Sequence, residues 1–301
     1  MCRLDVMKKG NIMKQIFDFS GIENNEKSIK STWQEFRNAL ANGEFLFDDI
    51  ESAKKHTFLR VYDDLFNKNA GIVHNTITIR DISDYCFGRG TILSESEIPD
   101  YERFIPKKEF IKSDNRFSPP GVEWLYLAIG DEEDIHTCAK AECRAKQGQR
   151  FGFCHFGIND SFDSLKLVDL TIADDISYET LNKQLEDYGQ SQVKKEIKTA
   201  KVLGFVPRNG IDKEEFKRIF TKWGVYTYAK LLSEQIFEPL SEMEDKSIMY
   251  APFQTMAQYY ISLGYSGIIF KSTVYERGKN IVLFDKAIAY PQGTIEEYRI
   301  K

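Results

Sequence analysis

The hydrophobic positions in the first third of the chain recur at helical intervals. Residues 33–40 place large apolar side chains three and four positions apart, and the order Ser-Thr-Trp-Gln from Ser31 has the form of a capping box. Residues 58–65 repeat the spacing more strongly, and the pattern stops near Gly71, a residue type typical of helix ends. These patterns predict a helical N-terminal region over residues 1–78.

Short runs rich in β-branched and aromatic residues follow, and they predict strands. The first four are GIVHNTITIRDI, WLYLAI, FGFCHFGI and LKLVDLTIA, with the change of pattern beginning near Gly71. Two more, SGIIFKS and NIVLFD, predict a strand pair joined by a polar loop that contains glycine.

Helical segments separate these strands. Residues 131–148 begin with acidic residues and end at a glycine, which predicts a helix ending at Gly148. A charged stretch over about 177–245 is mostly helical in pattern, and residues 253–261 keep helical spacing until Gly264. The fold class expected is α+β, with a second domain over residues 79–301 that carries a helical insertion at about 177–245.

Composition and charge narrow the range of partners. The 301 residues carry a formal net charge of -5 with a pI near 5.6, so no global basic field indicates direct binding of nucleic acid. No segment approaches the roughly 20 apolar residues of a membrane span. Five scattered cysteines indicate reduced thiols. We therefore expect a cytoplasmic protein without a membrane partner.

Standard motifs of chemistry are absent from the sequence. It contains no glycine-rich nucleotide loop, no H-E-x-x-H and no G-x-S-x-G. His136, Cys138, Cys143, Cys154 and His155 are close in sequence, but they lack the paired C-x2-4-C spacing of structural zinc sites. Buried thiols are the simpler interpretation, and no metal is predicted.

Three polar residues stand in unusual surroundings. Arg89 is flanked by two glycines, which allow close approach of backbone or ligand; Glu142 lies among small residues of the predicted helix; Ser272 closes a strand of core residues. Taken singly, each is best explained as an ordinary surface or strand-end residue.

Taken together, the segments around these residues resemble the RES domain, a bacterial family named for Arg, Glu and Ser. FGRG resembles its aromatic-x-Arg element, and TCAKAE its Ala-Leu-x-Glu helix. NRFSPPGVEWLYLA, which contains Arg116 and Tyr126, resembles its Arg-x-x-Pro-x-Gly turn and Tyr-Leu-Ala strand. GYSGIIFKS and GKNIVLF, the latter containing Asn280, resemble its closing elements, and YAPFQTMAQYY the helix before them. The resemblance covers about half of the chain, and its specificity lies in the ordered set.

Three features depart from the family pattern. The interval from Tyr126 to Glu142 is longer than expected, so the position of Glu142 depends on how GDEEDIHT folds. Ser266 stands where the family has an acid, and the insertion at about 177–245 is large.

The resemblance implies a mixed β core like that of ADP-ribosyltransferases and an enzyme that destroys NAD at the nicotinamide–ribose bond, typically a toxin with a cognate antitoxin. It implies catalytic roles for Arg89, Glu142 and Ser272, and NAD-binding roles for Arg89, Arg116, Tyr126, Ser272 and Asn280. NAD would be the substrate, with no prosthetic group.

Several alternatives stay open at the level of sequence. Hydrolysis and phosphorolysis would use the same cleft, so phosphate is a second candidate ligand. Two further alternatives are transfer of the ribose to a macromolecule, as in an ADP-ribosyltransferase, and a catalytically silent binding module. The remaining partners considered are an antitoxin protein and a second copy of the chain in a homodimer.

Overall fold

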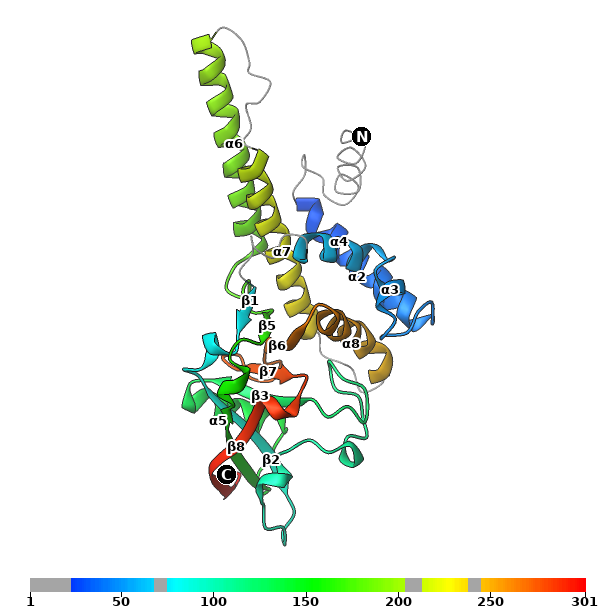
Figure 1. The fold of residues 1–301 in the computed structure, drawn as a ribbon, viewed down its shortest axis with the longest axis vertical. Helices are drawn as coiled ribbons and strands as arrows, with labels where there is room; N and C mark the ends of the chain where they lie inside the picture. Colours follow the sequence, from blue (N-terminus) through cyan, green and yellow to red (C-terminus); the bar gives the residue numbers. More distant parts are fainter. Residues whose placement is uncertain (1–22, 68–74, 204–212, 238–244) are drawn as a thin grey trace. The chain divides into compact units, whose positions relative to one another are not determined.

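A computed structural model describes residues 23–67, 75–203, 213–237 and 245–301 (Figure 1). The chain divides into two compact units. The first takes in the described parts of Met1–Asn38, Lys54–His74 and Ile172–Leu232. The second takes in the described parts of Ala39–Ala53, Asn75–Thr171 and Ser233–Lys301. The helices of the predicted insertion therefore cluster with the N-terminal helices, while the predicted domain boundary between residues 78 and 79 stays a prediction.

The described residues form helices and strands in the following order along the chain. The α-helices are α2 (Glu23–Ala41), α3 (Ile50–Ala53), α4 (Thr57–Phe66), α5 (Glu132–Glu142), α6 (Tyr178–Leu203), α7 (Lys213–Phe237) and α8 (Lys246–Ser262). The strands are β1 (Thr76–Thr78), β2 (Cys86–Leu93), β3 (Leu125–Gly130), β4 (Arg150–Ile158), β5 (Lys166–Asp169), β6 (Tyr265–Lys271), β7 (Lys279–Leu283) and β8 (Ala289–Arg299). Short 3-10 helices are Arg80–Ile82, Tyr101–Arg103, Lys108–Phe110, Asp160–Phe162 and Lys286–Ile288.

Within the described residues of the second unit, eight strands form one sheet in the order β1-β5-β6-β7-β3-β2-β4-β8. All neighbours are antiparallel except β5 and β6, which run parallel. The labels of β6, β7 and β3 follow one another in Figure 1, as this order requires. The α+β class expected from the sequence is confirmed, whereas the RES-specific form of the sheet stays a prediction.

Strand alternation divides the core of the second unit into two clusters. In β3, Leu125, Leu127 and Ile129 belong to the larger cluster, and Ala128 belongs to a smaller one beneath α5. Successive side chains of a strand point to opposite faces, so Tyr126 lies on the same face as Ala128. This alternation is why an apparently apolar run directs one tyrosine toward α5.

Helix α5 begins almost directly after β3. Gly130 has a positive φ of 150°, Asp131 is the N-cap residue and the first helical turn is acidic, which suits the positive end of the helix dipole. The helix ends at Glu142 rather than at the predicted Gly148. Its end is marked by Arg144, which has a φ of 48° where glycine is more usual. No additional loop therefore lies between Tyr126 and the helix.

The first unit is built around aromatic residues from its helices. Phe58 of α4 contacts Trp33 of α2 with ring centroids 4.9 Å apart, and Tyr228 of α7 at 5.4 Å. All three side chains are buried. The capping-box interpretation of Ser31 is wrong, because α2 already begins at Glu23 and the Ser31 hydroxyl donates to Glu35 within the helix.

Most other predicted elements are confirmed. WLYLAI and FGFCHFGI form β3 and β4, SGIIFKS and NIVLFD form the pair β6 and β7, and α8 ends just before Gly264, whose φ is 81°. The predicted helix end near Gly71 lies outside the described residues. Strands β2 and β8 were not among the predictions.

Across the described ranges, no helix combines the length and apolarity that crossing a lipid bilayer requires.

Candidate active site

The sheet opens between β2 and β3. Their ladder pairs only Cys86–Gly88 with Gly130–Ala128. Beyond this point β2 continues along β4 as far as Leu93, and β3 continues along β7 as far as Leu125, without pairing with each other. Arg89 is the first β2 residue past the end of the shared ladder. The separation of the two strands therefore leaves space for a side chain and a ligand.

A cavity of about 530 Å³ lies at this opening, within the second unit. Its size falls in the range of small-molecule sites. The lining combines backbone and apolar walls with charged side chains. The charged lining residues are Arg89, Asp114, Arg116, Glu142, Arg144 and Lys246.

Glu142 is the carboxylate of this cavity, and its orientation is fixed from behind. The Ser272 hydroxyl donates to Glu142 Oε1 at 2.8 Å, and Asn280 Nδ2 donates to the same oxygen at 2.6 Å. Ser272 and Asn280 are both buried, whereas Glu142 is exposed. Among the described residues, no donor reaches Glu142 Oε2. One oxygen is thus held by the protein while the other is accessible from the cavity.

Ser272 is itself held in place by backbone. Its hydroxyl oxygen accepts from the amides of Val274 and Tyr275, each at 3.2 Å, while its proton goes to Glu142. Ser272 is 1% exposed. The structure therefore places this residue behind Glu142, as a group that orients the carboxylate.

Arg89 brings positive charge to the cavity from β2. The residue is partly exposed, but its Nη1 atom is buried and has no hydrogen-bond partner among the described residues. Burial lowers the pKa of Arg89 to about 10, which still leaves the group cationic at neutral pH. A buried, unpaired guanidinium donor is costly, and an anionic ligand would satisfy it.

The glycines beside Arg89 serve packing within the protein. A Cβ at Gly88 would overlap the ring of Phe153, and one at Gly90 would overlap the ring of Phe151. Both rings belong to the cluster beneath α5. These glycines therefore allow the close approach that the sequence predicts, and the groups that approach their backbone are aromatic rings of β4.

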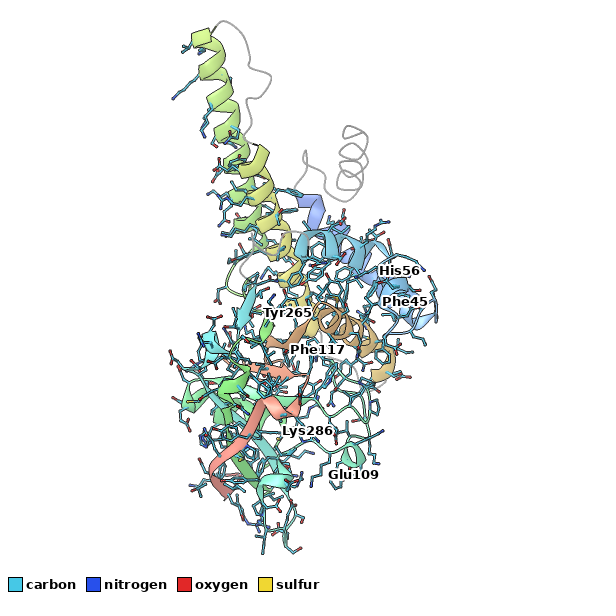
Figure 2. The ribbon with its side chains drawn as sticks, in the orientation of Figure 1. Phe45, His56, Glu109, Phe117, Tyr265 and Lys286 are labelled. Atoms are coloured by element: carbon cyan, nitrogen blue, oxygen red, sulfur yellow. The ribbon has the colours of Figure 1, made fainter. Side chains whose placement is uncertain are left out.

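Arg116 and Tyr126 reach the cavity from the segment NRFSPPGVEWLYLA. Arg116 lies over the ring of Tyr250 at 5.3 Å, and burial lowers its pKa. Burial also raises the pKa of Tyr126, whose hydroxyl lies 3.0 Å from Ser118 Oγ. Phe117, which follows Arg116 in the sequence, packs against Phe270 with ring centroids 4.9 Å apart. Figure 2 labels Phe117.

The structure brings together all six predicted site residues. Arg89, Arg116, Tyr126, Glu142 and Asn280 line the cavity, and Ser272 supports Glu142.

Sequence reasoning missed further lining residues, among them Asp114, Cys143, Arg144, Lys246 and Tyr250. The sequence carries no signal that Arg144 lines the cavity, because its pattern predicts a helix that continues to Gly148, whereas α5 ends at Glu142. Tyr250 begins the segment YAPFQTMAQYY, for which the sequence predicts a helix and no site residue.

The sequence predicts scattered thiols, and two of these cysteines lie in different parts of the core. Cys138 Sγ donates to Asn280 Oδ1 at 3.5 Å, whereas Cys154 Sγ donates to the His155 carbonyl at 3.3 Å. Cys138 and Cys154 are buried and belong to different core clusters. Burial raises the pKa of Cys143, at the cavity wall, to about 11.

Comparison of the chain with protein-family models, with curated proteins and with solved structures gave no match.

Proposed function

We propose that the cavity binds NAD and that Glu142 promotes cleavage of its nicotinamide–ribose bond. The observation that carries the proposal is the geometry of Glu142, whose Oε1 is held by Ser272 and Asn280 while the carboxylate faces a cavity lined by cations. The resemblance to the RES domain supplies the substrate class.

Departure of nicotinamide leaves positive charge on the ribose, as in the oxocarbenium-like transition state of glycoside hydrolysis. A fixed carboxylate next to the sugar stabilises that charge, and it needs no reorganisation when its position is already set by buried donors. Glu142 meets this requirement because its two donors are buried at 1% and 7% exposure.

The cations of the cavity suit the other end of the substrate. A diphosphate is best bound by planar guanidinium groups, which donate two parallel hydrogen bonds. Arg89 offers a buried Nη1 without a partner among the described residues, and Arg116 and Arg144 line the same cavity. Tyr126 presents a ring on which a planar base can stack.

The test is NAD consumption by the purified full chain, followed by release of nicotinamide. Glu142→Gln is expected to lower the rate by at least about 100-fold, because it removes the charge that stabilises the transition state. The glutamine keeps an acceptor oxygen for Ser272 and Asn280, so the fold should be retained. Glu133→Gln, an exposed carboxylate change on the same helix, is the matched control and should leave the rate unchanged.

A Glu142→Gln variant as fast as the unaltered protein would overturn the assignment. Running the assay with and without phosphate separates the two reactions by their products: hydrolysis gives nicotinamide and ADP-ribose, whereas phosphorolysis gives nicotinamide and ADP-ribose that carries phosphate on its anomeric carbon. With NAD labelled in its adenylate, label on macromolecules would instead identify an ADP-ribosyltransferase. Failure of the protein to bind NAD would favour the binding-module alternative.

A further inference from the structure

A second cluster of chemically capable side chains lies away from the cavity, at the first turns of α5. We propose that Glu132, His136 and His155 form a binding site for a divalent transition-metal ion, with zinc the preferred ion. One ligand atom from each residue lies within 4.8 Å of the other two. Two imidazoles and a carboxylate are a donor set that zinc binds well.

The three residues converge because of their places in the fold. Glu132 and His136 are four positions apart in α5, so they share one face of the helix. His155 lies two residues after Phe153 in β4 and therefore points to the same side of the sheet, the side covered by α5. Helix and strand thus contribute ligands from facing surfaces.

The donor atoms already point to one spot. His155 Nε2 lies 2.6 Å and His136 Nε2 lies 3.2 Å from the same oxygen, Glu132 Oε1. With zinc bonds of about 2.0–2.2 Å in tetrahedral geometry, neighbouring ligand atoms stand roughly 3.4 Å apart. Side-chain movements of less than about 1 Å would therefore admit the ion.

The imidazole rings are held in position by an aromatic side chain. His136 stacks on Phe153 with ring centroids 3.7 Å apart, and Phe153 meets His155 edge-on at 5.0 Å. Phe153 is completely buried, so it forms a rigid floor for both rings. Fixed ligand orientation lowers the entropic cost of binding a metal.

The surroundings supply outer partners and access. The Cys86 thiol lies close to the Glu132 carboxylate, where outer groups around metal sites are commonly found. Glu296 Oε1 lies 3.6 Å from His136 Nε2 and adds negative charge. The Glu132 side chain is 57% exposed, so an ion can enter from solvent.

A metal here would fasten the N-terminal half of α5 to β4. The C-terminal residue of that helix is Glu142, about 15 Å away along the helix axis at roughly 1.5 Å per residue. The site is therefore structural, and its existence does not depend on NAD cleavage.

The test uses the full chain without a histidine tag, freed of metal by a chelator and titrated with zinc against a chromophoric competitor. One zinc ion per chain is expected to bind, with a rise in the melting temperature. His155→Gln should weaken binding by more than roughly 100-fold, since loss of a ligand exceeds the 10–100-fold effect of outer-shell changes. Glu133→Gln removes a neighbouring exposed carboxylate and should bind zinc as the unaltered protein does.

His136→Gln, whose side chain is 24% exposed, gives a second ligand variant should His155→Gln fail to fold. Binding of zinc by both ligand variants at unaltered affinity would overturn the proposal, because the ion would then reside on other groups such as the cysteines. Failure of the unaltered protein to bind zinc at micromolar concentration would also overturn it. In that case the cluster is a hydrogen-bonded pair of histidines around Glu132. Neither outcome affects the test of Glu142, which measures NAD consumption.

Discussion

At the scale of single residues, the candidate site depends on which polar atoms the protein leaves unsatisfied. Glu142, which lines the cavity, has one carboxylate oxygen fixed and the other without a donor among the described residues, and Arg89 has a buried donor without a partner there. Folding does not gain stability from such an arrangement, because a buried unpaired donor costs about 1–3 kcal/mol. A ligand that supplies the missing acceptor would recover this energy on binding.

Arg89 provides the first test of this argument. Arg89→Lys keeps the positive charge but loses the planar fork, so we expect the affinity for NAD to fall by about 10-fold or more, equivalent to about 1.4 kcal/mol. Isothermal titration of the Glu142→Gln protein with NAD measures this without turnover. Arg80→Lys, an exposed arginine paired with Asp163, is the control, and equal losses in both variants would remove the special role of Arg89.

Cys143 reports on the same cavity through its reactivity. Burial raises the pKa of this thiol to about 11, and only the thiolate reacts with alkylating agents. Below pH 11 the thiol is protonated, so alkylation at pH 7.5 should be slow and should rise about tenfold per pH unit toward pH 11. Mass spectrometry after timed iodoacetamide treatment measures the rate for each cysteine.

NAD should slow the alkylation of Cys143 further, since the residue lines the cavity. Cys86, which is partly exposed and lies outside that lining, is the internal control. Equal protection of both cysteines, or of neither, would contradict binding of NAD in this cavity.

At the scale of elements, strand β2 and helix α5 determine each other's positions. Two β2 residues without side chains admit the rings of Phe151 and Phe153, and these rings with Ala139 form the cluster on which α5 rests. Glu142 is carried at the end of this helix. The position of the Glu142 carboxylate therefore depends on glycines in a neighbouring strand.

Gly88→Ala tests this dependence. The added methyl would overlap the Phe153 ring, so we expect the free energy of unfolding to fall by about 1–3 kcal/mol, as in other overpacked cores. Urea denaturation followed by circular dichroism measures the change. Gly189→Ala in α6 meets nothing within 4 Å and should stabilise by up to about 1 kcal/mol. A Gly88→Ala protein of unaltered stability would show that the ring can move aside without cost.

At the scale of the whole molecule, each of the two compact units has its own buried core. The core of the first unit is aromatic, and Phe58 lies at its centre with contacts to Trp33, Phe36, Tyr62 and Tyr228. The second unit contains the sheet and the cavity. Although the chain has a net charge of -5, the cavity lining carries more cationic than acidic side chains, which favours an anionic ligand locally.

Phe58→Ala is expected to destabilise the first unit by about 3–5 kcal/mol, because it removes a fully buried ring and leaves a cavity. Thermal or urea denaturation of the full chain provides the measurement. Ile197→Ala, at a side chain that is 50% exposed on α6, serves as the control and should change stability by less than about 0.5 kcal/mol. Similar losses in the two variants would contradict the central place of Phe58.

The sequence by itself determined those features that depend on neighbours along the chain. Apolar spacing identified α4 and α8, because periodicity follows directly from how side chains project from a helix. An acidic start followed by helix formers identified α5, and short runs of β-branched and apolar residues identified β3, β4 and the pair β6 and β7. It also singled out Arg89, Glu142 and Ser272, though only as an ordered set. It failed for β2, whose glycines make a weak strand signal, and for the C-terminus of α5, where Arg144 adopts a backbone conformation that usually requires glycine.

Only the tertiary structure decided which of these residues meet. Ser272 and Asn280 reach Glu142 from positions more than a hundred residues away, and the opening beside Arg89 exists because β2 and β3 stop pairing after three residues. His155 likewise joins Glu132 and His136 only because β4 lies beneath α5. Such contacts arise from strand register and helix packing, which long-range burial determines and local sequence patterns do not record.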